Sequence, residues 1–242
     1  MLVVDTPQPS HANGAHPHHA ALIARCGGLP PLTAAVVHPC DPASIAGAVM
    51  AAAAGLIVPV LVGPEAKIRA AAAEAAVDLS GLRLEPAPHS HAAAARAAAM
   101  AAGGEVKLLI KGALHTDELM HAVLAAEAGL RTDRRASHVF VIDAPHFPRP
   151  LLVTDAAINL RPGLGDKRDI VRNAIDLAHA IGIAAPRVAI LSAVETVEEK
   201  LPSTVDAAAL CKMAERGQIV GGVLDGPLAF DNAVSPEAAA EK

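Results

Sequence analysis

Polar residues that could carry chemistry recur in this chain directly after short apolar runs. The run Val223–Ala233 offers two carboxylates, Asp225 and Asp231, and the carboxamide of Asn232, where a predicted strand stops in Asp-Gly-Pro. In open α/β sheets, ligands bind at the carboxyl ends of the strands. We therefore expect this run to contribute to a ligand site.

A distributed set of candidate substrate-binding residues shares this placement. Lys111 offers a point charge for phosphate, Gly112 lets the backbone approach an anion, and Thr116, as a helix N-cap, adds a hydroxyl beside free amides. A solvated lysine and an ordinary cap explain the same residues equally well, and the others could serve only as turn or cap residues. The set is Lys111, Gly112, His115, Thr116, Asp155, Asn159, Ser192, Glu195, Ser203, Thr204, Asp225, Gly226 and Asp231.

Several common catalytic and nucleotide-binding motifs are missing from the sequence. It contains no Walker loop, and Gly163-Leu164-Gly165 lacks the third glycine of a dinucleotide fingerprint. No Gly-x-Ser-x-Gly elbow occurs, so a hydrolase triad has no anchor. The sequence motifs thus disfavour a Rossmann-type dehydrogenase and a serine hydrolase.

The composition narrows the class of protein. With 242 residues, 52% of them hydrophobic, the chain can bury a large core, and two α/β lobes are the natural expectation. The formal net charge of −5, together with 3 Phe and no Tyr or Trp, argues against nucleic-acid binding. Three cysteines that are far apart fit reduced thiols, so we expect a cytoplasmic protein.

Membrane insertion and secretion are not expected. The apolar runs 45–62 and 92–102 are rich in alanine and are interrupted by Gly55, Pro59 and Arg96. The N-terminal tail has no Lys or Arg and no long apolar centre, unlike a signal peptide. Its histidines could bind a metal, but a polar tail of this kind is typical of disorder, which we predict for residues 1–20.

The rest of the chain alternates apolar strands with helical patterns. A first lobe over residues 21–147 and a second lobe over residues 148–242 are predicted, with the Pro-rich segment 145–150 as the boundary. Asp41-Pro42 should start one helix, and Ser203 with Asp206 should form a capping-box-like start of another. Strands are expected at 34–38, 57–62, 82–85, 106–110, 139–143, 151–154, 188–191 and 219–224, with helices at 43–54, 64–76, 91–102, 116–128, around 170–181 and at 203–214.

Because helices separate most of these strands, mainly parallel sheets with flanking helices are expected. The predicted fold class is therefore α/β.

Six segments resemble one enzyme family. Leu109–Asp117, Ser137–Phe140, Thr154–Asn159, Leu191–Glu195, Pro202–Thr204 and Asp225–Asp231 are similar, in order, to motifs of the phosphate acetyltransferase and phosphate butyryltransferase family. The resemblance is strongest to the transferase half of bifunctional enoyl-CoA hydratase and phosphate acetyltransferase proteins, and it extends from about Leu22 to Lys242.

The resemblance implies reversible acyl transfer: an acetyl-CoA or butyryl-CoA and phosphate give an acyl phosphate and CoA. It also implies two lobes like those of isocitrate and isopropylmalate dehydrogenases, with the ligand cleft between them and the candidate residues lining it. Coenzyme A is then a substrate, no metal or other cofactor is needed, and homodimers or larger homo-oligomers are expected. A carboxylate takes the thiol proton of CoA in the family's proposed mechanism, while hydroxyl and cationic groups hold phosphate and the oxyanion.

One departure from the family leaves the catalytic residues unassigned. Family members continue into a segment that returns to the first lobe and carries a Ser/Arg/Asp cluster, and this segment is expected beyond Lys242. The alternatives are a non-catalytic CoA-binding or regulatory remnant of the fold, and a nicotinamide-dependent decarboxylating dehydrogenase. That dehydrogenase class needs clustered aspartates and a run of arginines, and the set Asp155, Asp225 and Asp231 has no such run beside it.

Overall fold

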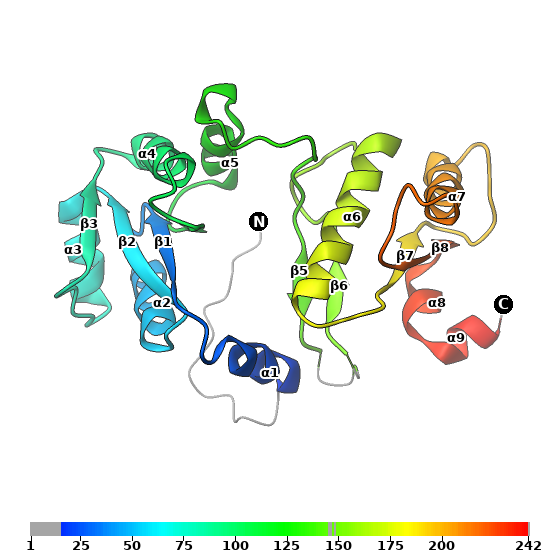
Figure 1. The fold of residues 1–242 in the computed structure, drawn as a ribbon, viewed down its shortest axis with the longest axis horizontal. Coiled ribbons are helices and arrows are strands. Elements are labelled where there is room, and N and C mark those ends of the chain that lie inside the picture. The colour runs from blue at the N-terminus through cyan, green and yellow to red at the C-terminus, as the bar shows by residue number, and fades with distance from the viewer. Residues whose placement is uncertain (1–15, 145–146, 148, 242) are drawn as a thin grey trace. The chain divides into compact units, whose positions relative to one another are not determined.

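The computed structural model describes residues 16–144, 147 and 149–241, which divide into two compact units. The described residues of unit 1 are 23–133, and those of unit 2 are 16–22, 134–144, 147 and 149–241. In Figure 1, residues 23–133 of unit 1 run from blue to green; unit 2 comprises the dark-blue residues 16–22 of α1 and the later residues, which run from green to red. Of the tail predicted to be disordered, residues 1–15 lie outside the described residues, and helix α1 spans Pro17–Cys26.

Unit 1 is built on a four-stranded parallel sheet. The strands β1 (Leu32–Val37), β2 (Ile57–Gly63), β3 (Arg83–Pro86) and β4 (Leu108–Lys111) are arranged in the order β3-β2-β1-β4. The helices that connect or follow them are α2 (Pro42–Ala53), α3 (Glu65–Glu74), α4 (Ser90–Ala102) and α5 (Thr116–Leu124), with a short 3₁₀ helix η1 at Ala126–Ala128. The predicted parallel pairing is confirmed here.

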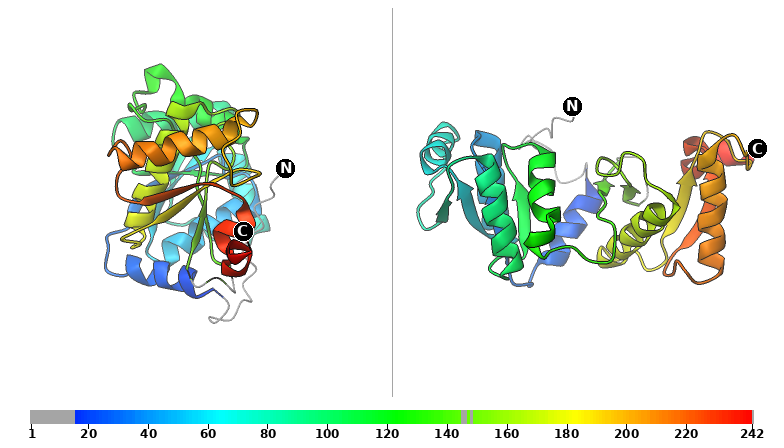
Figure 2. Two further views of the ribbon diagram at one scale, coloured as in Figure 1. Left: turned by 90° about the vertical axis from the view of Figure 1, so that its right-hand side faces the viewer. Right: turned by 90° about the horizontal axis from the view of Figure 1, so that it is seen from above.

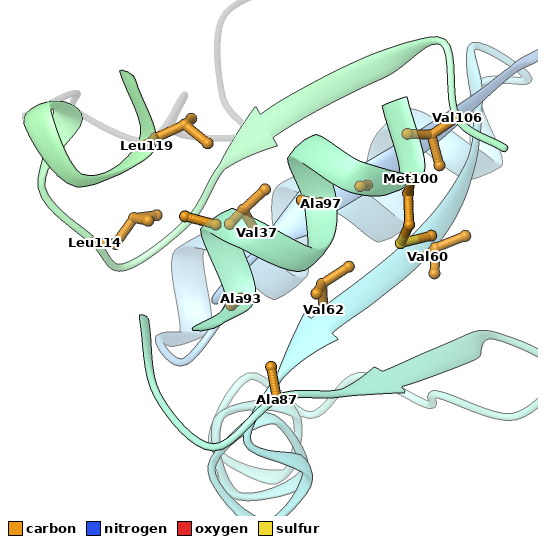
Figure 3. Packing of buried hydrophobic residues seen from close by; sticks show 12 residues of the cluster. Val37, Val60, Val62, Ala87, Ala93, Ala97, Met100, Val106, Leu114 and Leu119 are labelled. Atoms are coloured by element: carbon orange, nitrogen blue, oxygen red, sulfur yellow. The ribbon is translucent and has the colours of Figure 1, made fainter. Parts of the chain in front are cut away.

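The core of unit 1 lies on both faces of this sheet. Val37, Val60 and Val62 pack against Ala93, Ala97 and Met100 of α4, as Figure 3 shows from close by. On the other face, Val36 and Leu61 pack with Ile45 of α2 and Ile68 of α3. Small alanines let α4 approach the strands closely, and burial on both faces explains the near-continuous apolar runs of β1 and β2.

Unit 2 combines two small sheets with two long helices. Strands β5 (Phe140–Ile142) and β6 (Leu151–Val153) pair antiparallel, since no helix separates them, while β7 (Arg187–Leu191) and β8 (Val223–Leu228) pair in parallel. Helices α6 (Leu164–Ala180) and α7 (Pro202–Glu215) share an apolar cluster with β7 and β8 that includes Ile175, Leu210, Val188 and Leu224. The chain then forms α8 (Phe230–Val234) and α9 (Pro236–Ala240), drawn red in Figure 2.

The N-cap residues of α2, α5 and α7 can be compared with the predicted ones. Asp41 caps α2 as expected, because its Oδ1 accepts the Ser44 amide at 2.9 Å and Pro42 is the first helical residue. The predicted caps of α5 and α7 are wrong: His115 and Leu201 occupy the N-cap positions, and neither makes a side-chain cap bond. The hydroxyl of Ser203 and the carboxylate of Asp206 instead bond to Ser192 and to Lys167.

Strand β8 also differs from its prediction. It was expected at residues 219–224, but it spans Val223–Leu228 and contains Asp225-Gly226-Pro227. A register irregularity between Ala189 and Leu191 of β7 accommodates this segment. In the described part of the chain, no helix is long and apolar enough to cross a membrane.

Candidate functional site

In unit 1, the candidate residues lie where β4 passes into α5. Lys111 is the last residue of β4, and its Nζ donates to the backbone oxygens of Leu114 at 3.0 Å and Gly112 at 3.3 Å. His115 and Thr116 follow as the N-cap and the first helical residue of α5, and both side chains are exposed. No carboxylate forms an ion pair with Lys111 among the residues that the structure describes, so its charge is offset only by carbonyl dipoles.

Gly112 holds this loop against the end of β1. Its amide donates to the Val37 oxygen at 2.9 Å, and the Ala113 amide donates to the His38 oxygen at 2.9 Å. A Cβ at position 112 would lie 2.7 Å from the Val37 oxygen and 2.8 Å from the His38 oxygen, so only glycine fits. The glycine therefore serves a close backbone approach, and this contact explains it without a ligand.

His38 belongs to the same carboxyl edge, although the sequence analysis did not select it. It has a φ of 53° directly after β1, and its Nδ1 donates to the Ala113 oxygen at 2.7 Å. That bond assigns the proton of a neutral ring to Nδ1. A histidine immediately after an apolar strand was the available sequence signal, since the other candidates were chosen by that placement.

In unit 2, two serine hydroxyls meet at the carboxyl edge of the β7-β8 sheet. Ser192 follows β7, and its Oγ lies 2.7 Å from the Oγ of Ser203 in the first turn of α7. The Ser192 amide donates to the Leu228 oxygen at the end of β8 at 2.8 Å. The structure thus brings together two predicted site residues that come from different elements.

Thr204 has a structural role that its burial explains. Its side chain is fully buried, and its Oγ1 accepts the Glu198 amide at 2.8 Å and lies 2.8 Å from the Leu201 oxygen and 3.0 Å from the Glu198 oxygen. A hydroxyl can donate one hydrogen bond and accept two, so these contacts satisfy it. Thr204 holds the loop between β7 and α7 in place, and its complete burial keeps its hydroxyl away from a ligand at the surface.

Glu195 and Asn232 connect the loop after β7 to α8. The Asn232 Nδ2 donates to Glu195 Oε1 at 2.5 Å, across 37 positions of sequence. The Asn232 Oδ1 is buried and finds no donor among the described residues. Neighbouring Asp231 is exposed, and its Oδ1 accepts the Asn232 amide at 3.0 Å. Asn232 is the residue that sequence reasoning missed here: it stood in the opening motif but was not selected.

Asp225 and Gly226 lie inside β8, not after it as predicted. The exposed Asp225 carboxylate accepts the Gly226 amide through Oδ1 at 2.9 Å. A Cβ on Gly226 would lie 2.7 Å from the Ile190 oxygen, so the close pairing with β7 requires glycine there. Burial raises the pKa of the nearby Cys211 thiol, and the negative charges of Asp225 and Glu215 add to that rise.

Asp155 and Asn159 form a separate cluster before α6. Asp155 accepts the His138 amide at 2.7 Å through Oδ1, and through Oδ2 it accepts the Asn159 amide at 2.6 Å and the Asn159 Nδ2 at 2.7 Å. Burial alone would raise the pKa of Asp155, but the hydrogen bonds from His138 and Asn159 outweigh it and leave the pKa below its ordinary value. Asn159 also accepts from Arg135 and donates to the Ala136 oxygen. Both side chains therefore have protein partners.

In the described part of the chain, no three His, Cys, Asp or Glu side chains gather in a way that could hold a metal ion. The groups available for chemistry are thus the lysine and histidines of unit 1 and the serine pair and carboxylates of unit 2.

The α/β fold of this chain is shared by phosphotransacylases of known structure. The family model described as phosphate acetyl/butaryl transferase matches residues 87–242. The chain belongs to the phosphate acetyltransferase and butyryltransferase family, as the motifs predicted.

Known proteins similar to this chain agree with that assignment. A phosphate acetyltransferase of Rhizobium meliloti is 62% identical over 218 residues, which cover 90% of this chain and 69% of that protein. One of Rickettsia typhi is 55% identical over 93% of this chain and 65% of its own length. A crystal structure of a branched-chain phosphotransacylase from Enterococcus faecalis has 25% identity and a TM-score of 0.70, over 87% of this chain and 73% of that one. The chain spans about two thirds of the length of these curated relatives.

Proposed function

We propose that the protein containing this chain interconverts acyl-CoA and phosphate with acyl phosphate and CoA. The family match over residues 87–242 carries this proposal, because it includes the loop of Lys111 and all the strand-end residues of unit 2. Relatives named phosphate acetyltransferase and phosphate butyryltransferase cover most of the chain. We therefore infer acetyl or butyryl groups as the acyl class.

The reaction makes definite demands on the site. In the direction of acyl-CoA formation, a base removes the CoA thiol proton, the sulfur attacks the acyl carbonyl carbon, and the C–O bond to phosphate breaks as phosphate leaves. A thiol with a pKa near 8.5 is mostly protonated at pH 7, so a base is needed. Cations and hydroxyl groups then stabilise the oxyanion and the leaving phosphate.

The described residues fit the binding part of this task. Among the described residues Lys111 pairs with no carboxylate, its ammonium bonds to the Leu114 oxygen, and Thr116 starts α5 two residues later, so we assign phosphate or CoA phosphate contacts to these two. Ser192 and Ser203 present paired hydroxyls, which we assign to polar contacts with substrate. We further propose CoA as a substrate without a metal cofactor, a homo-oligomeric assembly and a cytoplasmic location.

Lys111→Ala in the full-length protein tests the phosphate assignment. Loss of a charge-assisted hydrogen bond costs about 1.5–3 kcal/mol, so the KM for phosphate should rise about tenfold or more. Release of free CoA thiol from acetyl-CoA or butyryl-CoA, measured against phosphate concentration, gives this value. Lys107→Ala is the matched control, because Lys107 is an exposed lysine that precedes the other end of β4. A Lys111→Ala enzyme with the parent KM both for phosphate and for acyl-CoA would contradict the assignment.

A further inference from the structure

We propose that Asn232 is a positioning residue that holds Glu195 as an acceptor for the uncharged pantetheine arm of CoA. The inference rests on the proposed function and concerns the same edge of the β7-β8 sheet. It assigns a role to a bond that joins the loop after β7 to α8, the 2.5 Å contact between Asn232 Nδ2 and Glu195 Oε1.

The orientation of the Asn232 carboxamide follows from its partner. A carboxylate only accepts hydrogen bonds, so the amide nitrogen must face Glu195 and the amide oxygen must point away. That oxygen is buried and has no donor among the described residues. A buried acceptor without a donor destabilises a fold, and an apolar side chain would avoid that cost. Fold stability therefore does not explain why an asparagine stands at position 232. The need to hold Glu195 does explain it.

The place of Glu195 is fixed from several sides. Its loop begins at Ser192, which bonds to the Leu228 oxygen of β8 and to the Ser203 hydroxyl of α7. The same loop is fastened further along by the buried Thr204, which accepts the Glu198 amide. The Asn232 amide contacts the carboxylate itself, which is thus held at the strand ends where α/β sheets bind ligands.

The charge of Glu195 selects the part of CoA that it can contact. A carboxylate repels phosphate groups and attracts N–H, O–H or S–H donors, and its two oxygens offer about four lone-pair directions, of which the Asn232 bond takes one. The pantetheine arm of CoA supplies two amide N–H groups, a hydroxyl and the thiol, and it carries no charge. Glu195 is therefore assigned to this arm.

Three variants of the full-length protein separate this role from a merely structural link. Glu195→Gln keeps the shape and a bond to Asn232 but removes the charge; Asn232→Ala removes the support. The exchange Glu195→Gln with Asn232→Asp keeps one hydrogen bond and moves the charge to the other residue. Glu65→Gln in α3 is the matched control, because it makes the same chemical change in an exposed pair with Arg69.

Three quantities are measured for the parent and each variant. They are the KM for CoA, the KM for phosphate in the reverse direction, and the Kd for CoA by calorimetry. Both single variants should raise the KM and Kd for CoA about tenfold while the KM for phosphate and kcat stay within about twofold, equivalent to one lost hydrogen bond to a charged group. The exchange should keep the parent thermal midpoint within about 3 °C but should not restore CoA binding.

Two outcomes overturn the inference alone: parent-like CoA binding in Glu195→Gln, or full recovery of CoA binding in the exchanged protein, which would make the pair a structural link. A parent protein that binds no CoA at all overturns both the inference and the proposed function. A parent that turns over acyl-CoA while Glu195→Gln is unaffected leaves the proposed function standing.

Discussion

Asp155 illustrates how protein donors can occupy a carboxylate that the sequence offered to a ligand. Both of its oxygens accept hydrogen bonds, from His138 and from two nitrogens of Asn159, and these bonds join residues on either side of the β5-β6 pair. The role of Asp155 is then to close a turn, the simpler of the two interpretations open from the sequence.

We predict that Asp155→Asn destabilises the protein in a pH-dependent way. The folded-state pKa of Asp155 lies below its unfolded value, so its contribution is complete above the unfolded pKa and is lost as the pH falls through the folded pKa. At pH 7 the variant should lose about 2 kcal/mol, the scale of hydrogen bonds to a charged group.

Urea unfolding of parent and variant between pH 7 and pH 2 measures this difference. It should shrink as the pH drops below the ordinary aspartate value of about 3.9. Glu74→Gln, at an exposed position at the end of α3, should show little difference at any pH. A constant Asp155→Asn effect down to pH 2 would mean that packing, not charge, is lost.

Single residues also show where sequence reasoning reached its limit. Strand-end placement selected Lys111 and Ser192 as candidates, because a residue's position after an apolar run can be read from the pattern alone. It could not identify Asn232 as a partner of Glu195, since that contact depends on which loops meet in space. Nor could it show that Thr204 is buried and bonded to its own loop, where a ligand cannot reach it.

At the scale of elements, four charged side chains tie β3 to α4. Arg83 lies 2.7 Å from Glu85 and 3.3 Å from Glu105, and Arg96 lies 2.8 Å from Glu85 and 3.6 Å from Glu105. The Arg96 hydrogen bond, followed by that of Arg83, lowers the pKa of Glu85. The ring joins an edge strand of the unit 1 sheet to the helix that covers it.

Glu85→Gln should weaken this ring. Because the members are partly exposed, we expect a loss of about 0.5–1 kcal/mol of unfolding free energy at low salt, and less at 0.5 M NaCl because ions screen the charges. Denaturant titrations at both salt concentrations measure the effect. An equal loss at both would indicate that the side chain contributes packing instead of charge.

Element predictions succeeded where one local signal decided the structure. Asp41-Pro42 starts α2 as expected, since a cap and the fixed φ of proline act within one turn. The prediction for β8 was wrong, because Gly226 and Pro227 read locally as a turn while pairing with β7 keeps them in a strand. Likewise Ser203 and Asp206 failed as a capping box because Ser192 and Lys167 are their partners. Such tertiary partners cannot be read from neighbouring residues.

At the scale of the whole molecule, the α/β class and the mainly parallel pairing could be predicted, because buried parallel strands leave long apolar runs between helices. The lobe boundary was proposed at residues 147–148, whereas the compact units change between Asp133 and Arg134. The chain there has no helix or strand from 130 to 139, and no glycine or proline cluster marks that stretch after Gly129. Composition therefore gave no boundary signal.

Limited proteolysis should reveal this connecting stretch. Arg131 is exposed in it, so trypsin should cut there early and leave two fragments that resist further digestion. Arg149 and Arg161 precede prolines and should resist trypsin, and the bonds of Thr204 should protect Lys200. Arg131→Gln should delay the first cut. Early cleavage inside α4 or α6 in the parent protein would contradict the division into two units.

Backbone hydrogen bonds at Gly112 couple the loop after β4 to the turn after β1. Amides of Gly112 and Ala113 bond to Val37 and His38, and the His38 ring returns a bond to Ala113 across 75 positions of sequence. Neither loop can shift without carrying the other. The position of the Lys111 ammonium therefore depends on the turn after β1 as well as on β4. A substitution of His38 would change the position of Lys111.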